Sequence, residues 1–190
     1  MRLLVSSDFH LSPTLTYQCL SMLEDVDAFI YLGDYCNKAG LDSSWYGGCN
    51  PQGIHEVRLL YDFMGAVNRV GVPCLFVAGN HEPSAKYMPW SMCNWSIFHK
   101  PSNILWHGSR GRRLIVQIYP TGYEPLCPPA LHTPWRAPER VSLLLSHEPI
   151  KDYRKYYSPN LYAHGHIHTG GGHTHGGYLN AACGNYIVEL

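Results

Sequence analysis

Seven side chains of kinds that bind metals stand directly after short apolar segments of this sequence. They comprise two carboxylates, one amide and four imidazoles: Asp8, His10, Asp34, Asn80, His147, His166 and His168. They occur in five local patterns, which are Asp-Phe-His, Gly-Asp, Gly-Asn-His-Glu, a single His, and Gly-His-Ile-His. A donor set of nitrogen and oxygen without sulfur suits manganese, with iron, zinc, nickel or cobalt as alternatives. The pattern therefore predicts transition-metal binding.

The number of donors is sufficient for two divalent ions. Two such ions about 3.5–4 Å apart repel each other and need bridging anions between them. A central aspartate that reaches both ions supplies one bridge, and water or hydroxide supplies the other. Ions of this kind lower the pKa of bound water toward roughly 7, so that hydroxide is available as a nucleophile at neutral pH.

Short apolar segments and one amphipathic segment predict the strands and helices that position these donors. Strands are expected at 2–5, 28–32, 74–78, 114–119, 141–145, 160–163, 177–182 and 186–190, and helices at 15–23 and 54–70. Residues 35–53 are rich in Gly, Asn and Ser and residues 120–138 in Pro, so both segments are expected to be loops. Because open α/β sheets bind ligands at the carboxyl ends of their strands, the polar patterns are expected to meet there.

Taken in this order, the five patterns resemble the calcineurin-like metallophosphoesterase superfamily, over the stretch from Asp8 to Asn185. One such pattern alone is weak, but five in order, each closing an apolar segment, are specific. The resemblance implies an α/β fold, a four-layer α/β/β/α sandwich with two mixed sheets. It also implies the ligand sets: Asp8, His10 and His168 for one ion, Asn80, His147 and His166 for the other, and Asp34 as the bridge.

The same resemblance implies a phosphoesterase in which His81 faces the leaving group as a general acid. Two divalent ions, Asp8, Asp34 and one hydroxide leave about one net positive charge, which attracts a phosphoryl group. The expected function is hydrolysis of a small or nucleotide phosphodiester by a metal-bridging hydroxide. The alternatives are a phosphomonoesterase, a nucleotide pyrophosphatase, a nuclease, and, from another class, a non-catalytic scaffold of the same fold that binds partners.

A second Gly-His-x-His pattern, at 172–175, competes with the one at 165–168. The first follows an apolar segment, whereas the second follows glycines and lacks rigid support. Asn180 also opens a turn that resembles the family's Asn-Pro-Gly-Ser turn, at the spacing usual for the first match. We therefore assign His166 and His168 as ligands and expect His173 and His175 in a flexible loop near the cleft.

Several other side chains have two interpretations. We expect Glu82 to fix His81, Glu148 to be a structural hydrogen-bond partner, and His164 to pack at the end of its strand. The aromatic residues Tyr87, Trp90 and Trp95 fit either the core or a wall for a substrate base. The basic run Arg110, Arg112 and Arg113 fits a solvated hairpin better than a phosphate contact.

Composition sets the broader expectations. A length of 190 residues with 45% apolar residues predicts one domain, over residues 1–190. No apolar run approaches the roughly 20 residues that span a bilayer, and the first residues lack a secretory apolar region. Seven scattered Cys favour the cytoplasm. The 14 basic and 14 acidic residues balance, so the chain has no broad positive field that would attract a nucleic-acid polymer. The expected partner is therefore a small phosphorylated substrate. The sequence leaves the oligomeric state open.

Overall fold

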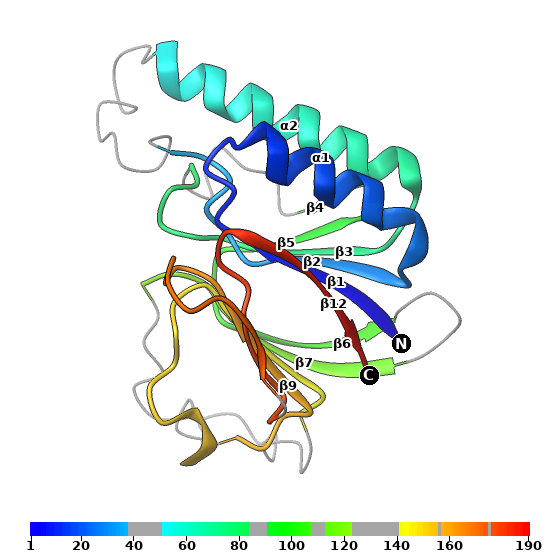
Figure 1. Ribbon diagram of the computed structural model, residues 1–190, viewed down its shortest axis with the longest axis vertical. Coiled ribbons are helices and arrows are strands. Elements are labelled where there is room, and N and C mark those ends of the chain that lie inside the picture. Colours follow the sequence, from blue (N-terminus) through cyan, green and yellow to red (C-terminus); the bar gives the residue numbers. More distant parts are fainter. Residues whose placement is uncertain (38–50, 84–90, 108–112, 123–140, 156, 175) are drawn as a thin grey trace.

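Two stacked β-sheets make up the centre of the protein, and two helices cover the outer face of one of them (Figure 1). The computed structural model describes residues 1–37, 51–83, 91–107, 113–122, 141–155, 157–174 and 176–190. Within these described residues each sheet has six strands, with four parallel strands in the middle and one antiparallel strand at either edge. Both sheets are therefore mixed, as the sequence predicts.

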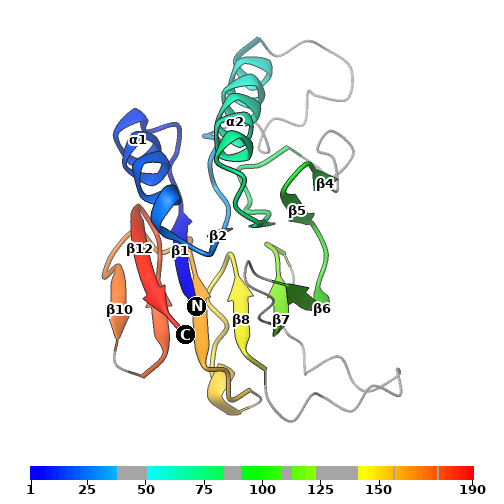
Figure 2. The ribbon, with the colours of Figure 1, turned by 90° about the vertical axis from the view of Figure 1, so that its right-hand side faces the viewer.

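Sheet A has the order β12-β1-β2-β3-β5-β4 and sheet B the order β10-β11-β9-β8-β7-β6. The strands of sheet A are β1 (Arg2–Ser7), β2 (Ala28–Tyr31), β3 (Cys74–Val77), β4 (Ser91–Met92), β5 (Trp95–Phe98) and β12 (Gly184–Glu189). Those of sheet B are β6 (Ser102–His107), β7 (Arg113–Tyr119), β8 (Leu143–Ser146), β9 (Leu161–His164), β10 (Gly172–Thr174) and β11 (Tyr178–Asn180). In Figure 2, which is turned by 90°, the labelled strands β10, β8, β7 and β6 of sheet B follow one another from left to right.

Helices α1 (Pro13–Met22) and α2 (Pro51–Val70) connect the first three parallel strands. Helix α1 begins where Ser12 accepts a hydrogen bond from the Leu15 N–H at 3.4 Å, with Pro at the first helical position. It is followed by the short 3₁₀ helix η1 (Leu23–Asp25). The apolar stripe of α2 packs against Phe29, Phe76 and Trp95 on the outer face of sheet A.

The core between the sheets is aliphatic and draws on both ends of the chain. It includes Leu3 and Val5 of β1 and Leu143 and Leu145 of β8, all fully buried. Alternate residues of β8 and β9 point to the other face of sheet B, where Tyr162 joins a separate cluster of tyrosines. In the described chain this outer face is covered by the 3₁₀ helix η4 (Tyr153–Lys155) through Tyr153, whose ring lies 4.2 Å from that of Tyr162.

The described residues include no helix that is both long enough and apolar enough to cross a membrane.

Trp95, for which the sequence allows two roles, is buried in the core on β5. Tyr87 and Trp90, like Arg110, Arg112 and His132, lie outside the described residues. Arg113 is exposed at the start of β7, and His55 and His107 are also exposed.

Candidate metal centre

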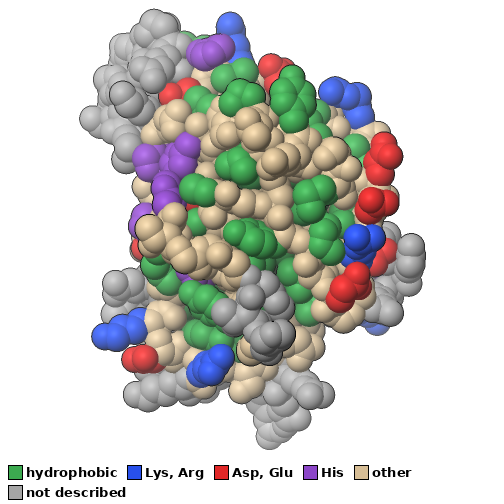
Figure 3. Space-filling model, viewed as in Figure 1, with side chains coloured by type: hydrophobic (Ala, Val, Ile, Leu, Met, Phe, Trp, Pro, Cys, Tyr) green, Lys and Arg blue, Asp and Glu red, His purple; other side chains and the backbone are tan. Residues whose placement is uncertain are grey.

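The predicted ligands converge at one edge of the sandwich, where the parallel strands of both sheets end. Asp8 follows β1, Asp34 lies beyond the end of β2, and Asn80 beyond β3, while His147 follows β8 and His166 lies just beyond β9. Several histidines emerge together on this edge of the surface, in the purple area of Figure 3. The topology thus brings the predicted ligands, which are spread along the chain from Asp8 to His168, into a single site.

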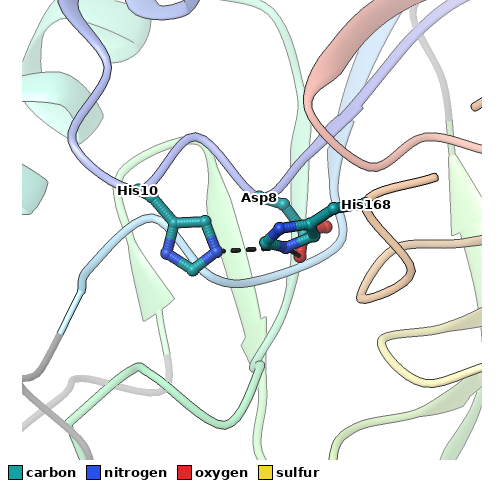
Figure 4. A group of neighbouring side chains, drawn as sticks. All are labelled: Asp8, His10 and His168. Carbon is teal, nitrogen blue, oxygen red and sulfur yellow. Dashed lines mark hydrogen bonds and ion pairs between the residues drawn. The ribbon is translucent and has the colours of Figure 1, made fainter.

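The first group of candidate ligands is Asp8, His10 and His168 (Figure 4). Nε2 of His10 and Nε2 of His168 are 3.2 Å apart, and the latter lies 3.1 Å from Oδ1 of Asp8. Nδ1 of His10 is 3.1 Å from the Cys36 carbonyl oxygen. A carbonyl only accepts, so Nδ1 carries the proton and the lone pair of Nε2 faces the group.

The second group is Asp34, His147 and His166, together with Asn80. Nε2 of His147 lies 3.0 Å from Oδ1 of Asn80, 3.2 Å from Oδ2 of Asp34 and 3.2 Å from Nδ1 of His166. His147 donates its Nδ1 proton to the Leu32 carbonyl oxygen at 2.7 Å. The lone pair of Nε2 in the neutral ring therefore faces three further acceptor-capable groups.

This convergence of lone pairs fits metal ions. Acceptors can face one another only across a proton or a cation, and ligands held at about 2.1 Å around one octahedral ion lie about 3 Å apart. The spacings of 3.0–3.2 Å in both groups match that arrangement. The residues of this chain therefore fit two divalent ions, one in each group.

The charges of the site are coupled. Burial works to lower the pKa of His147, but the hydrogen bond and charge of Asp34 outweigh it and raise that pKa to about 9. Burial acts in the opposite sense on Asp34, and the same interaction with His147 keeps the pKa of Asp34 below its usual value. The Asp34 carboxylate thus favours a positive charge beside it in the second group.

The backbone is strained at the candidate ligands. Asp8, His10, Asp34 and His166 all have positive φ angles, of 55°, 45°, 59° and 66°. Residues other than glycine seldom adopt this conformation, and such strain clusters at functional sites, where the surrounding structure holds it in place. Four of the seven predicted ligands share this feature.

Glycines allow the backbone to approach the two aspartates closely. A Cβ atom on Gly79 would overlap the carboxylate of Asp34, and one on Gly165 would overlap Ser7 and Asp8. The glycines of the Gly-Asn and Gly-His patterns are thus required by the carboxylates that they face.

His81 lies beside both groups without joining either. Its Nε2 is 3.9 Å from Oδ2 of Asp34, and its ring meets that of His10 edge to face at 5.0 Å. Its backbone N–H donates to Oδ1 of Asp34 at 2.9 Å, and its Nδ1 contacts the Asn37 carbonyl oxygen. The side chain is 24% exposed, so its free edge is accessible from solvent.

Comparison with known proteins identifies the family. The family model described as "Calcineurin-like phosphoesterase" matches residues 1–170, most of the chain. The protein belongs to the calcineurin-like phosphoesterase family. It is therefore a metal-dependent phosphoesterase, and the resemblance that the sequence motifs suggest is confirmed. No curated protein matches the chain.

Solved structures share the fold of this phosphoesterase. One crystal structure has a TM-score of 0.61 and 16% sequence identity, over 94% of this chain and 89% of that chain. YfcE, a phosphoesterase from E. coli, has a TM-score of 0.50 and 15% identity, over 99% of this chain and 81% of that chain. These likenesses confirm the predicted α/β sandwich of two mixed sheets.

Two expectations for this phosphoesterase need correction. The sequence predicts that Glu82 fixes His81, whereas its buried carboxylate accepts backbone N–H groups of Asp34, Tyr35 and Gly79, at 2.7, 2.6 and 2.7 Å. The sequence also predicts a flexible loop around His173, whereas Gly172–Thr174 forms the edge strand β10. The Gly-rich composition suggested a loop, but pairing with β11 overrides it.

Glu148 and His164 behave as the sequence predicts. Glu148 accepts a hydrogen bond from the Thr121 hydroxyl. His164 is buried at the end of β9, where its Nε2 lies 2.5 Å from the Tyr178 hydroxyl. Burial lowers the pKa of His164.

Two supporting residues are missed by sequence reasoning. The Ser7 hydroxyl donates to Oδ2 of Asp8 at 2.5 Å. The Asn180 amide donates to the carbonyls of Ile167 and Thr169, at 2.9 and 3.2 Å. These two hydrogen bonds hold the backbone on both sides of His168. The Asn180 turn is visible in the sequence as a motif, but its role depends on a contact between segments 13 residues apart.

The duplicated pattern gives a direct mutational test. We expect His168→Ala to remove about one metal ion per chain, because His168 belongs to the first group of candidate ligands. His173→Ala and His175→Ala should keep the metal content of the wild type. Metal analysis of the three purified variants measures this, and loss of metal from the His173 or His175 variant alone would reverse the assignment.

Proposed function

We propose that the protein hydrolyses small phosphodiesters, nucleotide diesters among them, at a centre of two transition-metal ions, with manganese as the preferred metal. The observation that carries this proposal is the pair of adjacent ligand groups, Asp8, His10 and His168 beside Asp34, His147 and His166. When bound, the two ions would supply hydroxide at neutral pH and stabilise charge on the phosphoryl oxygens.

In this proposal the Asp34 carboxylate would help to hold both ions. Its Oδ2 lies 3.2 Å from Nε2 of His147 in the second group. Burial lowers the pKa of His10 in the first group, and among the charges that oppose this effect Asp34 acts more strongly than Asp8. The charge of Asp34 thus acts on both groups, and the backbone N–H of His81 holds its other oxygen.

His81 is proposed to protonate the leaving group. The Asn37 carbonyl oxygen holds its Nδ1 proton and leaves Nε2 on the side of Asp34 and His10. A protonated Nε2 can then donate to a departing alkoxide, which is costly to expel without a proton. A complete ligand set together with this histidine favours a diester with an alkyl or ribose leaving group over the monoester and pyrophosphate alternatives.

We also propose that the 190 residues form one domain and act without a nucleic-acid polymer as partner. The core between the sheets supports the first point, because it contains Met1, buries Val188 and packs against Leu190. The equal numbers of basic and acidic residues, 14 of each, support the second. The cytoplasm remains the proposed location.

The test is a comparison of two aryl substrates after removal of all metal and addition of manganese. We expect the protein to turn over bis-p-nitrophenyl phosphate with a higher kcat/KM than p-nitrophenyl phosphate. Faster turnover of the monoester would make the protein a phosphomonoesterase. Two bound ions with no hydrolysis of either ester would favour the scaffold alternative.

A further inference from the structure

The segment from Leu32 to Asn37 orients three histidines of the site through its carbonyl oxygens. Leu32 accepts from Nδ1 of His147 at 2.7 Å, Cys36 accepts from Nδ1 of His10 at 3.1 Å, and Asn37 contacts Nδ1 of His81. Each contact places the ring proton on Nδ1 and turns Nε2 toward the site. The segment therefore fixes the tautomer of each ring.

A buried carboxylate of helix α2 binds the far side of one of these peptide groups. Glu56 is 1% exposed, and its Oε2 accepts the Asn37 N–H at 3.0 Å. The N–H of Asn37 and the C=O of Cys36 belong to the same peptide group. The contacts therefore form a line, from the Glu56 carboxylate through this peptide to the imidazole of His10.

Through these hydrogen bonds the charge of Glu56 can polarise the imidazole of His10. A carboxylate that accepts the N–H of a peptide increases the electron density on its carbonyl oxygen, because hydrogen bonds in a chain polarise one another. A stronger carbonyl acceptor then holds the Nδ1 proton of His10 more firmly. The electron pair of Nε2 becomes more basic as a result, which makes Nε2 a better ligand for a metal. Carboxylates that contact a ligand histidine directly have this effect, and here a peptide group lies between them.

Glu82 acts on the same segment in a different way. It accepts the N–H groups of Asp34 and Tyr35. The carbonyls of those two peptide groups, Gly33 and Asp34, accept the backbone N–H groups of Asp8 and His10, at 2.9 and 3.1 Å. Glu82 thus secures the backbone, whereas the peptide that Glu56 binds contacts an imidazole side chain.

We propose that Glu56 is a positioning residue for the metal centre, which sets the tautomer and the donor strength of His10 through the Cys36–Asn37 peptide group. The proposal rests on the proposed function in one respect, the role of His10 as a ligand. Glu56 is buried and belongs to neither group of candidate ligands. It is remote in sequence from every motif of the family, in the second turn of the amphipathic helix α2.

The experiment compares Glu56→Gln with Asp62→Asn. Glutamine keeps the size of the side chain and an oxygen that can accept the Asn37 N–H, but it removes the charge. Asp62 is an exposed carboxylate six residues further along the same helix, so Asp62→Asn is a control for loss of one charge from α2. The two readouts are the NMR shift of the His10 Nδ1 proton in metal-free protein and a cobalt(II) titration followed by absorption. The step of the cobalt titration that is lost in the His168→Ala variant is the one that belongs to the first ligand group.

We expect Glu56→Gln to move the His10 Nδ1 proton upfield and to raise the Kd of the first group by about tenfold, with little change at the second group. Glu56→Met, which also removes the acceptor, should weaken that group further. Asp62→Asn should resemble the wild type in both readouts. If Glu56→Met does not fold, the Gln and Asn variants decide the question alone.

Two results would overturn the proposal. One is a Glu56→Gln variant with the wild-type proton shift and wild-type affinity at both groups. The other is an equal loss of affinity at both groups, with a lower Tm and an unchanged proton shift, which would make Glu56 purely structural. A wild-type protein that binds fewer than two ions would instead contradict the proposed function, and the proton shift would still test Glu56.

Discussion

Asp34→Asn is expected to empty both ligand groups of metal and to reduce hydrolysis by about 10³-fold. The substitution removes the charge on a buried carboxylate of the second group that also acts on the first group. Oδ2 of Asp34 faces His147 at 3.2 Å, and its charge also acts on His10. Two divalent ions held side by side need this negative charge to offset their repulsion. Metal analysis and turnover of bis-p-nitrophenyl phosphate, both on the same preparation, measure the effect.

The control for this substitution is Asp62→Asn, which removes an exposed carboxylate of α2. It should keep both metal content and rate. Loss of a single ion from Asp34→Asn, with the second ion bound as in the wild type, would show that Asp34 does not bridge.

His81→Ala is expected to slow hydrolysis of a nucleotide phosphodiester by about 10²–10⁴-fold and to slow an activated aryl ester much less. A ribose alkoxide is a poor leaving group that needs a proton, whereas p-nitrophenolate leaves without one. Metal content should change little, because Nε2 of His81 stands 3.9 Å from the nearest oxygen of Asp34, outside both ligand groups. Paired rate measurements with both substrates, on wild type and variant, test this.

The two substrates separate the possible roles of His81. Equal losses of rate on both would remove it as the proton donor. A loss of metal from the variant would instead place His81 among the ligands.

The places of the candidate ligands in the fold, and the sheets that carry them, could be predicted because both depend on short-range patterns. Apolar segments followed by polar residues locate β1, β2, β3, β7, β8 and β9 to within a few residues. The 3.6-residue apolar period locates α2, which begins at Pro51 rather than at residue 54. The family motifs then place the polar residues at the strand ends.

The strands that were missed are short or at an edge, where the apolar pattern is weak. β4 has two residues and β10 three, and β10 lies in a glycine-rich stretch. In β6 the exposed Leu105 breaks the alternation that marks a half-buried strand. β5 is not among the predicted strands, because the aromatic Trp95 fits either the core or a wall for a substrate base.

The supporting contacts of the site could not be predicted from the sequence. Glu56 and Asn37 are 19 residues apart, and Glu82 and Asp34 are 48 apart. Each contact exists only because the loops after β2 and β3 meet at the sheet edge beside α2. A charged residue in a helix predicts solvent exposure, so the burial of Glu56 required the structure.

The number of transition-metal ions bound per folded chain tests the central claim most directly. Metal analysis of protein loaded with manganese and freed of excess ion measures it, with hydrolysis followed before and after chelation. We predict about two ions per chain, loss of hydrolysis when both are removed, and recovery when manganese is returned. Full hydrolysis by protein that holds no metal would contradict the account.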